Sequence, residues 1–168
     1  MISNKKFFLA AAVAALMVGQ SPVHAATATN PLAVSATVSN NCTITAGALA
    51  FGTYDALTAN ASTNLDQTGS FSITCTKGTV YSVSLSLGAH TSGTARRMVN
   101  ASNAAAFLTY EIYNDSFGGT VWNGANMVSG TAASKGTAIT LTAYGRIPSG
   151  QDASQGSYSD TVVETVTF

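Results

Sequence analysis

The residues that could carry out catalysis or bind a metal are few and widely spaced. Beyond residue 25 there is one histidine, His90, in a Gly/Ser-rich stretch. There is no G-x-S-x-G nucleophile motif, no D-x-D-x-D-G calcium loop and no Gly-rich loop opening a helix. "NDSFGG" is interpreted as a turn, and one histidine with two cysteines is too small a donor set for zinc. We therefore expect no enzyme, no metal and no cofactor.

The acidic residues support the same conclusion, because none of them forms an obvious acid–base pair. They are scattered along the chain: Asp55, Asp66, Glu111, Asp115, Asp152, Asp160 and Glu164.

Residues 1–25 have the pattern of a cleaved secretory signal. Lys5 and Lys6 supply the positive start, Phe7 to Val18 is apolar, and Val23-His24-Ala25 ends with small residues at the −3 and −1 positions. The apolar run is shorter than the roughly 20 residues of a membrane span. We expect export and no membrane span after signal cleavage.

Charge is sparse in the mature chain. The full sequence has seven basic and seven acidic residues. Loss of Lys5 and Lys6 leaves 7 − 2 = 5 basic residues, a net charge of 5 − 7 = −2. Because nucleic-acid binding requires a basic patch, we expect no nucleic-acid partner. A surface built from Ser, Thr, Asn and Gly repels its neighbours weakly.

Cys42 and Cys75 are the only cysteines. In an exported chain they predict one disulfide, and their wide spacing differs from that of a redox-active C-x-x-C pair.

Alternation with period two predicts antiparallel strands with one buried face. It is clear in "SFSITCT" (70–76), "VYSVSLSLG" (80–88), "FLTYEIY" (107–113) and "AITLTAYGRI" (138–147). Short strands separated by Gly, Asn, Asp and Ser indicate a β-sandwich. Residues 90–106 show no pattern and are expected to form a long connection, with a single helical turn at "NASNAAA" (100–106).

The two ends of the mature chain also alternate. In "PLAVSATVSNNC", one face carries Leu32, Val34, Ala36 and Val38. This strand belongs either to its own domain or to another molecule.

The final stretch "GSYSDTVVETVTF" places Val162, Val166 and Phe168 on one face and ends inside a strand. Glu164 falls on the same face, where a carboxylate is unfavourable unless paired. A bulge that turns Val163 inward would relieve this.

The chain resembles the spore coat U family of secreted bacterial proteins, which includes subunits of archaic chaperone–usher pili. The resemblance rests on six motifs that occur in the same order, with both cysteines in place. They are "LAVSATVSNNCTI", "LAFGTYD", "ITCTKGTVYSVSLSLG", "LTYEIYND", "YGRIPSGQ" and "GSYSDTVVETVTF". The resemblance implies an all-β fold: an incomplete immunoglobulin-like sandwich completed by a donated N-terminal strand. The implied organisation is a signal peptide at 1–25, an extension with the donor strand at 26–41, and a pilin domain at 42–168.

The same resemblance implies an assembly pathway by donor-strand complementation. A periplasmic chaperone fills a groove beside the last strand, binding at Val162, Val166 and the Phe168 carboxylate. The next subunit then replaces it with its own Leu32, Val34, Ala36 and Val38. Cys42 and Cys75 would be the family disulfide.

The implied partners are the chaperone, an outer-membrane usher and further subunits. The implied location is the bacterial surface, in a fibre for adhesion and biofilm formation. Arg96, Arg97 and residues 90–106 would be available for contacts between subunits.

Two alternatives remain open. In the first, residues 32–38 fold back as the protein's own strand, giving a self-complemented secreted or coat protein. In the second, Trp122, Tyr110 and Tyr113 form a carbohydrate-binding platform, although such residues more often fill a sandwich core.

Overall fold

A computed structural model describes residues 24–168, so most of the predicted signal peptide (1–25) lies outside the described residues. The chain divides at Ala36/Thr37 into an N-terminal segment and a compact domain. In the N-terminal segment the described residues, 24–36, are exposed and belong to no helix or strand.

The domain is built from β-strands, and no described residue is helical. In chain order the strands are β1 (Cys42–Ala48), β2 (Leu65–Cys75), β3 (Val80–Leu85), β4 (Arg96–Asn100), β5 (Asn103–Tyr113), β6 (Val128–Thr131), β7 (Ala138–Ile147), β8 (Tyr158–Ser159) and β9 (Glu164–Thr167).

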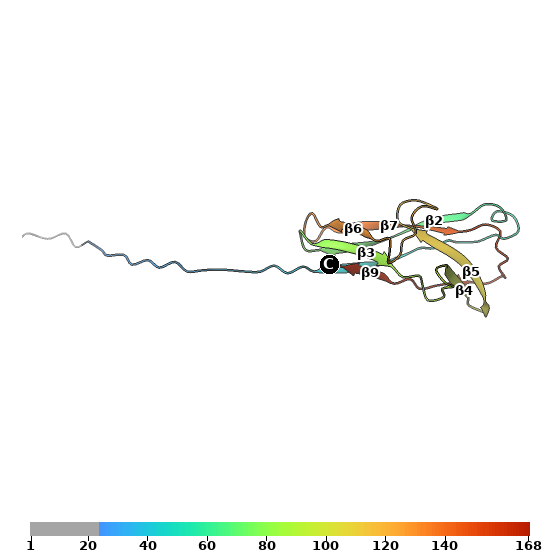
Figure 1. Cartoon of the computed structure of the whole chain (residues 1–168), viewed down its shortest axis with the longest axis horizontal. Helices are drawn as coiled ribbons and strands as arrows, with labels where there is room; N and C mark the ends of the chain where they lie inside the picture. The colour runs from blue at the N-terminus through green and yellow to red at the C-terminus, as the bar shows by residue number, and fades with distance from the viewer. Residues whose placement is uncertain (1–23) are drawn as a thin grey trace, which may run out of the picture. The chain divides into compact units, whose positions relative to one another are not determined.

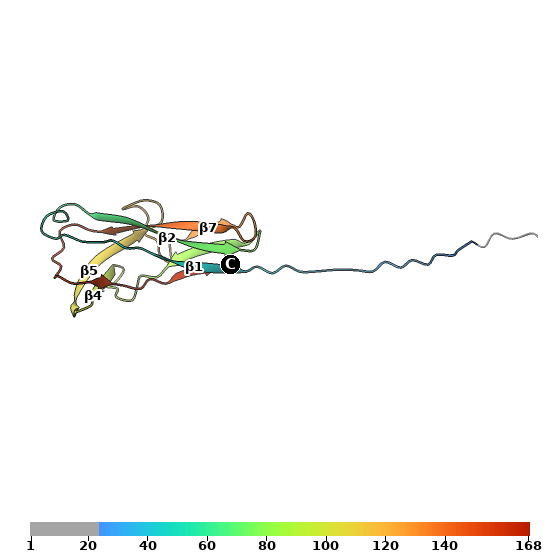
Figure 2. The same cartoon turned by 180° about the vertical axis from the view of Figure 1, so that it is seen from behind.

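The strands form two sheets that face each other. The six-stranded sheet has the order β1-β2-β7-β5-β4-β8, and the three-stranded sheet has the order β6-β3-β9, with every pairing antiparallel. Figure 1 shows β3 beside β9, and Figure 2, seen from behind, shows β2 beside β7 of the other sheet. After β8 the chain leaves the large sheet, and at β9 it joins the small one. Residues 160–163 therefore cross between the layers.

The alternation in the sequence builds the core between the sheets. Ile73 of β2, Val83 of β3 and Trp122 have no exposed surface, and Trp122 stacks on Phe71 of β2 at 5.5 Å between ring centroids. The indole N–H of Trp122 donates to the Val83 carbonyl at 2.9 Å. The four strand predictions from period-two patterns are confirmed, and the all-β sandwich with them.

The predicted connection at residues 90–106 is wrong. It contains β4 and the start of β5, which pair with each other from Arg96↔Tyr110 to Asn100↔Asn103. "NASNAAA" is a hairpin turn leading into β5 and not a helical turn: the Asn100 side chain accepts a hydrogen bond from the Ser102 N–H at 2.9 Å. The pattern was hidden because Arg96 points inward, where alternation predicts an apolar residue.

The predicted disulfide joins Cys42 to Cys75, which lie directly opposite each other in the β1–β2 ladder. It fastens the first strand of the domain to the second across a sequence separation of 33. Among the described strands β1 pairs only with β2, so the disulfide reinforces the one ladder that holds β1 in the large sheet.

Removing this disulfide should destabilise the domain. We expect the double substitution Cys42→Ser/Cys75→Ser to lower the free energy of unfolding by about 3–4 kcal/mol, from the loop-closure entropy restored to the unfolded chain. Urea unfolding of the monomeric fraction measures this. The matched control is Thr43→Ser/Thr74→Ser, the neighbouring pair in the same ladder. Equal stability of the two variants would contradict the prediction.

Candidate functional site: an open groove between two edge strands

One side of the sandwich is bordered by two edge strands. β1 is the outermost strand of the large sheet and β9 is an outermost strand of the small sheet. Their Cα atoms come within 8 Å of each other. The free edges of both strands therefore face the same gap, and unpaired backbone groups of this kind favour addition of another strand.

A groove of about 430 Å³ opens at the Gly47 end of this gap and is lined on its other side by residues 158–162 and Glu164. Its walls are Gly47 and Ala48 of β1 on one side and the Val162–Glu164 region on the other, and core side chains including Phe71, Leu85 and Ile112 form its floor. Position 47 requires glycine, because a Cβ there would collide with the backbone carbonyl oxygen of Ser70. The core is thus accessible from this side through an opening that has both apolar and polar lining residues.

Glu164 lies in the wall of the groove. It is half-buried, as are Val162 and Val166 on either side of it, whereas Val163 is 58% exposed. The expected bulge that would turn Val163 inward is therefore absent, and the alternation continues through the carboxylate. Burial raises the pKa of the Glu164 carboxyl above its ordinary value, although a hydrogen bond from the Gly47 backbone N–H opposes this. That hydrogen bond joins β9 to β1 across the groove.

Asp160 lines the same groove but has partners. Its side chain is 2% exposed. One carboxylate oxygen accepts from the Tyr110 hydroxyl at 2.7 Å; the other accepts from the Ala89 N–H at 2.9 Å and lies 3.0 Å from His90 Nδ1. Burial alone would raise the pKa of Asp160, but these hydrogen bonds hold it below its usual value. Asp160 thereby fixes the crossing segment 160–163 to β5 and to the loop after β3.

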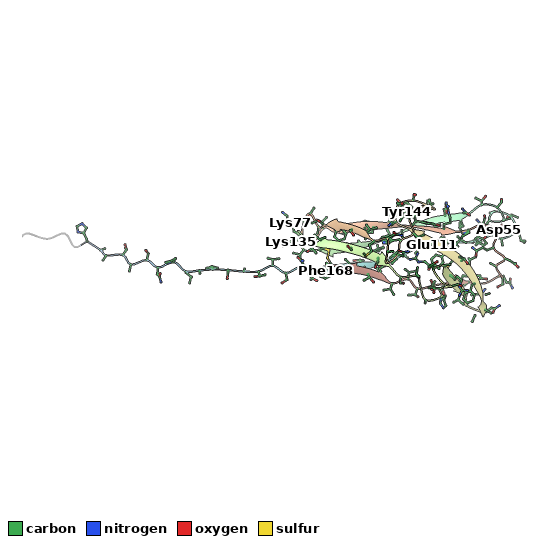
Figure 3. All side chains as sticks on the ribbon, in the orientation of Figure 1. Asp55, Lys77, Glu111, Lys135, Tyr144 and Phe168 are labelled. Atoms are coloured by element: carbon green, nitrogen blue, oxygen red, sulfur yellow. A yellow bond between two sulfur atoms is a disulfide. The ribbon has the colours of Figure 1, made fainter. Side chains whose placement is uncertain are left out.

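Arg96 holds the two sheets together behind the groove. Its side chain is fully buried and forms an ion pair with Glu111 of β5. Its Nε and one terminal nitrogen donate to the Ser86 carbonyl at 3.1 and 2.7 Å, and the same terminal nitrogen donates to the Trp122 carbonyl at 2.7 Å. Figure 3 shows Glu111 among the strands of the domain, with Phe168 at one end and Asp55 at the other.

Ser86 connects Arg96 to the groove wall. Its N–H donates to the Val163 carbonyl at 2.9 Å, and its hydroxyl accepts from the Val163 N–H at 2.8 Å. Arg96 therefore positions the start of β9 through Ser86. The idea that Arg96 serves contacts between subunits is wrong, because no part of it reaches the surface. Arg97 is partly exposed and lies 4.0 Å from the centroid of the Phe107 ring.

The aromatic residues considered as a carbohydrate platform do not form one. Trp122 is fully buried and Tyr110 is 4% exposed. Tyr110 donates to Asp160, and burial, followed by this hydrogen bond, raises its pKa. Trp122 and Tyr110 fill the core, as such residues usually do in sandwiches, and Tyr113 at the end of β5 is half-buried.

Among the predicted groove residues, Val162 lines the groove and Val166 packs against the core next to it. Phe168 lies one alternation further along and is 50% exposed. The predicted donor residues lie in no strand. Leu32, Val34 and Val38 are 87%, 86% and 81% exposed, and Ala36 is exposed as well.

Sequence reasoning missed Asp160, Gly47 and the role of Arg96. The only available signal for Arg96 was its position in the chain. It lies two residues before Met98 and four before Asn100, so all three side chains fall on the inner face of a short strand. Among residues 24–168 no group of acids, histidines and cysteines is placed to hold a metal ion. In the same range no helix is long and apolar enough to cross a membrane.

Comparison with known sequences identifies the family of proteins to which this sandwich with one open side belongs. The family profile of the Spore Coat Protein U domain matches residues 28–165, and the chain belongs to this family. The match begins before Pro31, so the exposed N-terminal segment is part of the family's pattern.

Two known proteins show the relationship in detail. Protein U of Myxococcus xanthus is 35% identical over 171 residues, which covers 95% of both chains. A chain in the crystal structure of the CsuC–CsuE chaperone–tip adhesion subunit pre-assembly complex, from the archaic chaperone–usher Csu pili of Acinetobacter baumannii, is similar with a TM-score of 0.53 and 28% identity. The similarity covers 79% of this chain but only 40% of the length of that chain.

Proposed function

We propose that this protein is a structural pilus subunit that polymerises by donor-strand complementation into a surface fibre. The observation that carries the proposal is a pair of complementary features in one chain. The domain has a groove that opens onto the core beside two free strand edges, and the same chain has an exposed segment with four apolar residues in strict alternation.

The two features match in chemistry and length. Seven residues from Leu32 to Val38 extend about 23 Å as a strand, the length of one sheet element. Transfer of Leu32, Val34 and Val38 from water into a groove would stabilise the contact by roughly 5–8 kcal/mol, with backbone hydrogen bonds in addition. A head-to-tail contact of this kind does not close on itself, so repetition builds a filament.

The partners follow from the same contact. Before assembly, the open groove is an aggregation hazard, so a periplasmic chaperone is required to cover it. An outer-membrane usher would then pass the subunits to the cell surface. The relation to a chain of a chaperone–subunit complex supports the chaperone partner. In this proposal the fibre serves adhesion and biofilm formation at the bacterial surface.

The test is the native size of the full chain with and without its N-terminal segment. We expect the chain, exported to the periplasm and run unheated on a denaturing gel, to give a ladder of multimers that collapses on boiling. Deletion of residues 26–39 should leave only monomer, because the groove then has no strand to receive.

A matched control separates loss of the strand from loss of the segment's length. Ser35→Asp and Thr37→Asp lie on the other face of the segment and should keep the ladder, whereas Val34→Asp should abolish it. A stable full-length monomer whose deletion variant unfolds would overturn the proposal and favour self-complementation. A monomer that binds carbohydrate and never forms a ladder would favour the binding-module alternative.

A further inference from the structure

We propose that the groove of one copy receives the N-terminal segment of a second copy in one register, antiparallel to β9, with Ala36 of the incoming strand opposite Glu164. This inference rests on the proposed function and specifies its contact. It makes Ala36 and Glu164 the residues that determine how successive subunits align.

The free edge of β9 has a defined set of backbone groups. Both the N–H and the C=O of Val163 bond to Ser86 on the β3 side. Since backbone direction alternates along a strand, Thr165 and Thr167 also face β3, while Glu164 and Val166 direct their N–H and C=O groups away from it. The residues that offer backbone bonds to a new strand are therefore those whose side chains line the interior.

The interior row of this strand is apolar except at one position. It runs Val162, Glu164, Val166 and then Phe168. The donor row runs Leu32, Val34, Ala36 and Val38, with a single small member. Cross-strand neighbours in a ladder are about 4.5–5.5 Å apart at Cβ, so the residue opposite Glu164 must leave space for a carboxylate.

Only one antiparallel alignment meets this requirement throughout. With Ala36 opposite Glu164, Val38 meets Val162 in the groove, while Val34 meets Val166 and Leu32 meets the half-exposed Phe168 further along the chain, beyond the residues that line the groove. A two-residue slip in either direction places Val34 or Val38 on the carboxylate. A one-residue slip turns the whole apolar face outward.

The parallel orientation fits less well. If Ala36 is opposite Glu164 in that direction, Leu32 falls opposite Asp160, whose side chain is buried and holds three hydrogen-bonding partners. Insertion there would place the largest donor side chain against a fixed ionised group. The antiparallel orientation instead places Leu32 beyond β9, against the Phe168 ring.

The opposite wall adds no side chain at this level. Gly47 of β1 donates to the Glu164 carboxylate, so the two lie in the same row across the groove. A strand between β1 and β9 needs about 9.4–9.8 Å between them, twice the spacing of neighbouring strands. Since the two strands now approach within 8 Å, they must separate on insertion. A row of Glu164, Ala36 and Gly47 has side-chain bulk only at Glu164.

Cysteine pairs in the full chain test the register. Among the described residues there is no free cysteine, so new ones report without interference. We expect Ala36→Cys/Glu164→Cys to give a ladder that survives boiling without reductant. The offset pairs Val34→Cys/Glu164→Cys and Val38→Cys/Glu164→Cys should crosslink about tenfold less, because diagonal neighbours are roughly 7–8 Å apart and a disulfide requires about 3.5–4.5 Å at Cβ.

A size exchange gives an independent readout. Ala36→Leu should make the multimers dissociate at least about tenfold faster, and Glu164→Ala in the same chain should restore them, because the added and removed volumes meet in one row. The control Ala33→Leu lies on the outer face and should have little effect.

The outcomes separate this inference from the proposed function. Two results would overturn the register while leaving polymerisation intact, provided that the chains still form a ladder. One is efficient crosslinking of an offset pair, and the other is failure of Glu164→Ala to rescue Ala36→Leu. Failure of the unmodified chain to form any ladder would overturn the proposed function. A 36–164 crosslink confined to monomers would overturn both and indicate self-insertion.

Discussion

Substitution of Arg96 by Met should lower the free energy of unfolding of the domain by about 3–5 kcal/mol, as expected when one partner of a buried ion pair is removed. The buried guanidinium is the partner of the Glu111 carboxylate and of the carbonyl groups of Ser86 and Trp122. Methionine fills much of the volume but leaves these three acceptors without their donor. The loss is measured by denaturant unfolding of the monomeric fraction.

Arg97 provides the matched control on the same strand. It donates to the His90 and Thr91 carbonyl groups at 3.1 Å each and lies on the Phe107 ring, but it is partly exposed. We expect Arg97→Met to lower stability by no more than about 1 kcal/mol, the range of exposed cation–π contacts. Equal losses at the two positions would show that the inter-sheet network does not carry the stability assigned to it.

A second substitution divides the Arg96 effect into parts. Adding Glu111→Leu to Arg96→Met removes the uncompensated carboxylate, so part of the loss should be recovered. The Ser86 and Trp122 carbonyls remain unpaired, and recovery should be incomplete. Because Ser86 also holds Val163, the same variant is expected to weaken the groove wall.

The strands with one clean apolar face could be predicted from sequence, because burial of alternate residues leaves a direct trace in the chain. The β7 strand begins and ends where "AITLTAYGRI" does. β4 could not be found in this way, since an arginine occupies its inner face. An ion pair with a residue 15 positions later makes that burial favourable, and no local pattern reveals such a partner.

The groove was predicted only in outline. Alternation in the last strand placed Val162 and Val166 inward, and the structure agrees. It also placed Glu164 inward, and the expectation that a bulge would avoid this was wrong because the Gly47 N–H supplies a partner from the far wall. Asp160 could not be assigned, since its partners come from the loop after β3 and from β5. These contacts depend on the sheet order, which sequence periodicity does not encode.

The groove holds two carboxyl groups in opposite electrostatic situations. Asp160 is surrounded by donors and its pKa lies below the ordinary value of 3.8. Its contribution to stability is present above the unfolded-state pKa and is lost as the pH falls through the lower folded-state value. Glu164 has one backbone donor, and burial raises its pKa above 4.5. The ionised form of Glu164 is therefore the less favourable one in the groove.

Multimers should for this reason be more stable in mild acid than at neutral pH. A donor strand over the groove would remove more water from Glu164 and raise its pKa further, so insertion is coupled to proton uptake. The other titratable groups that line the groove are Asp160, Tyr110 and Tyr158. The affinity is highest below the pKa of the free subunit and falls by up to about tenfold per pH unit until the pKa in the multimer is reached.

The dissociation rate of the ladder, measured from about pH 4.5 to 7.5, tests this coupling over a range in which Asp160 stays ionised. Glu164→Gln retains the acceptor for the Gly47 N–H but removes the charge, so it should flatten the pH profile and slow dissociation at neutral pH. Asp152→Asn removes an exposed carboxylate outside the groove and should keep the normal profile. Of the two carboxyl groups that line the groove, only Glu164 has a raised pKa, so the coupling is assigned to Glu164. A pH profile for Glu164→Gln as steep as that of the unmodified chain would exclude Glu164 as the titrating group.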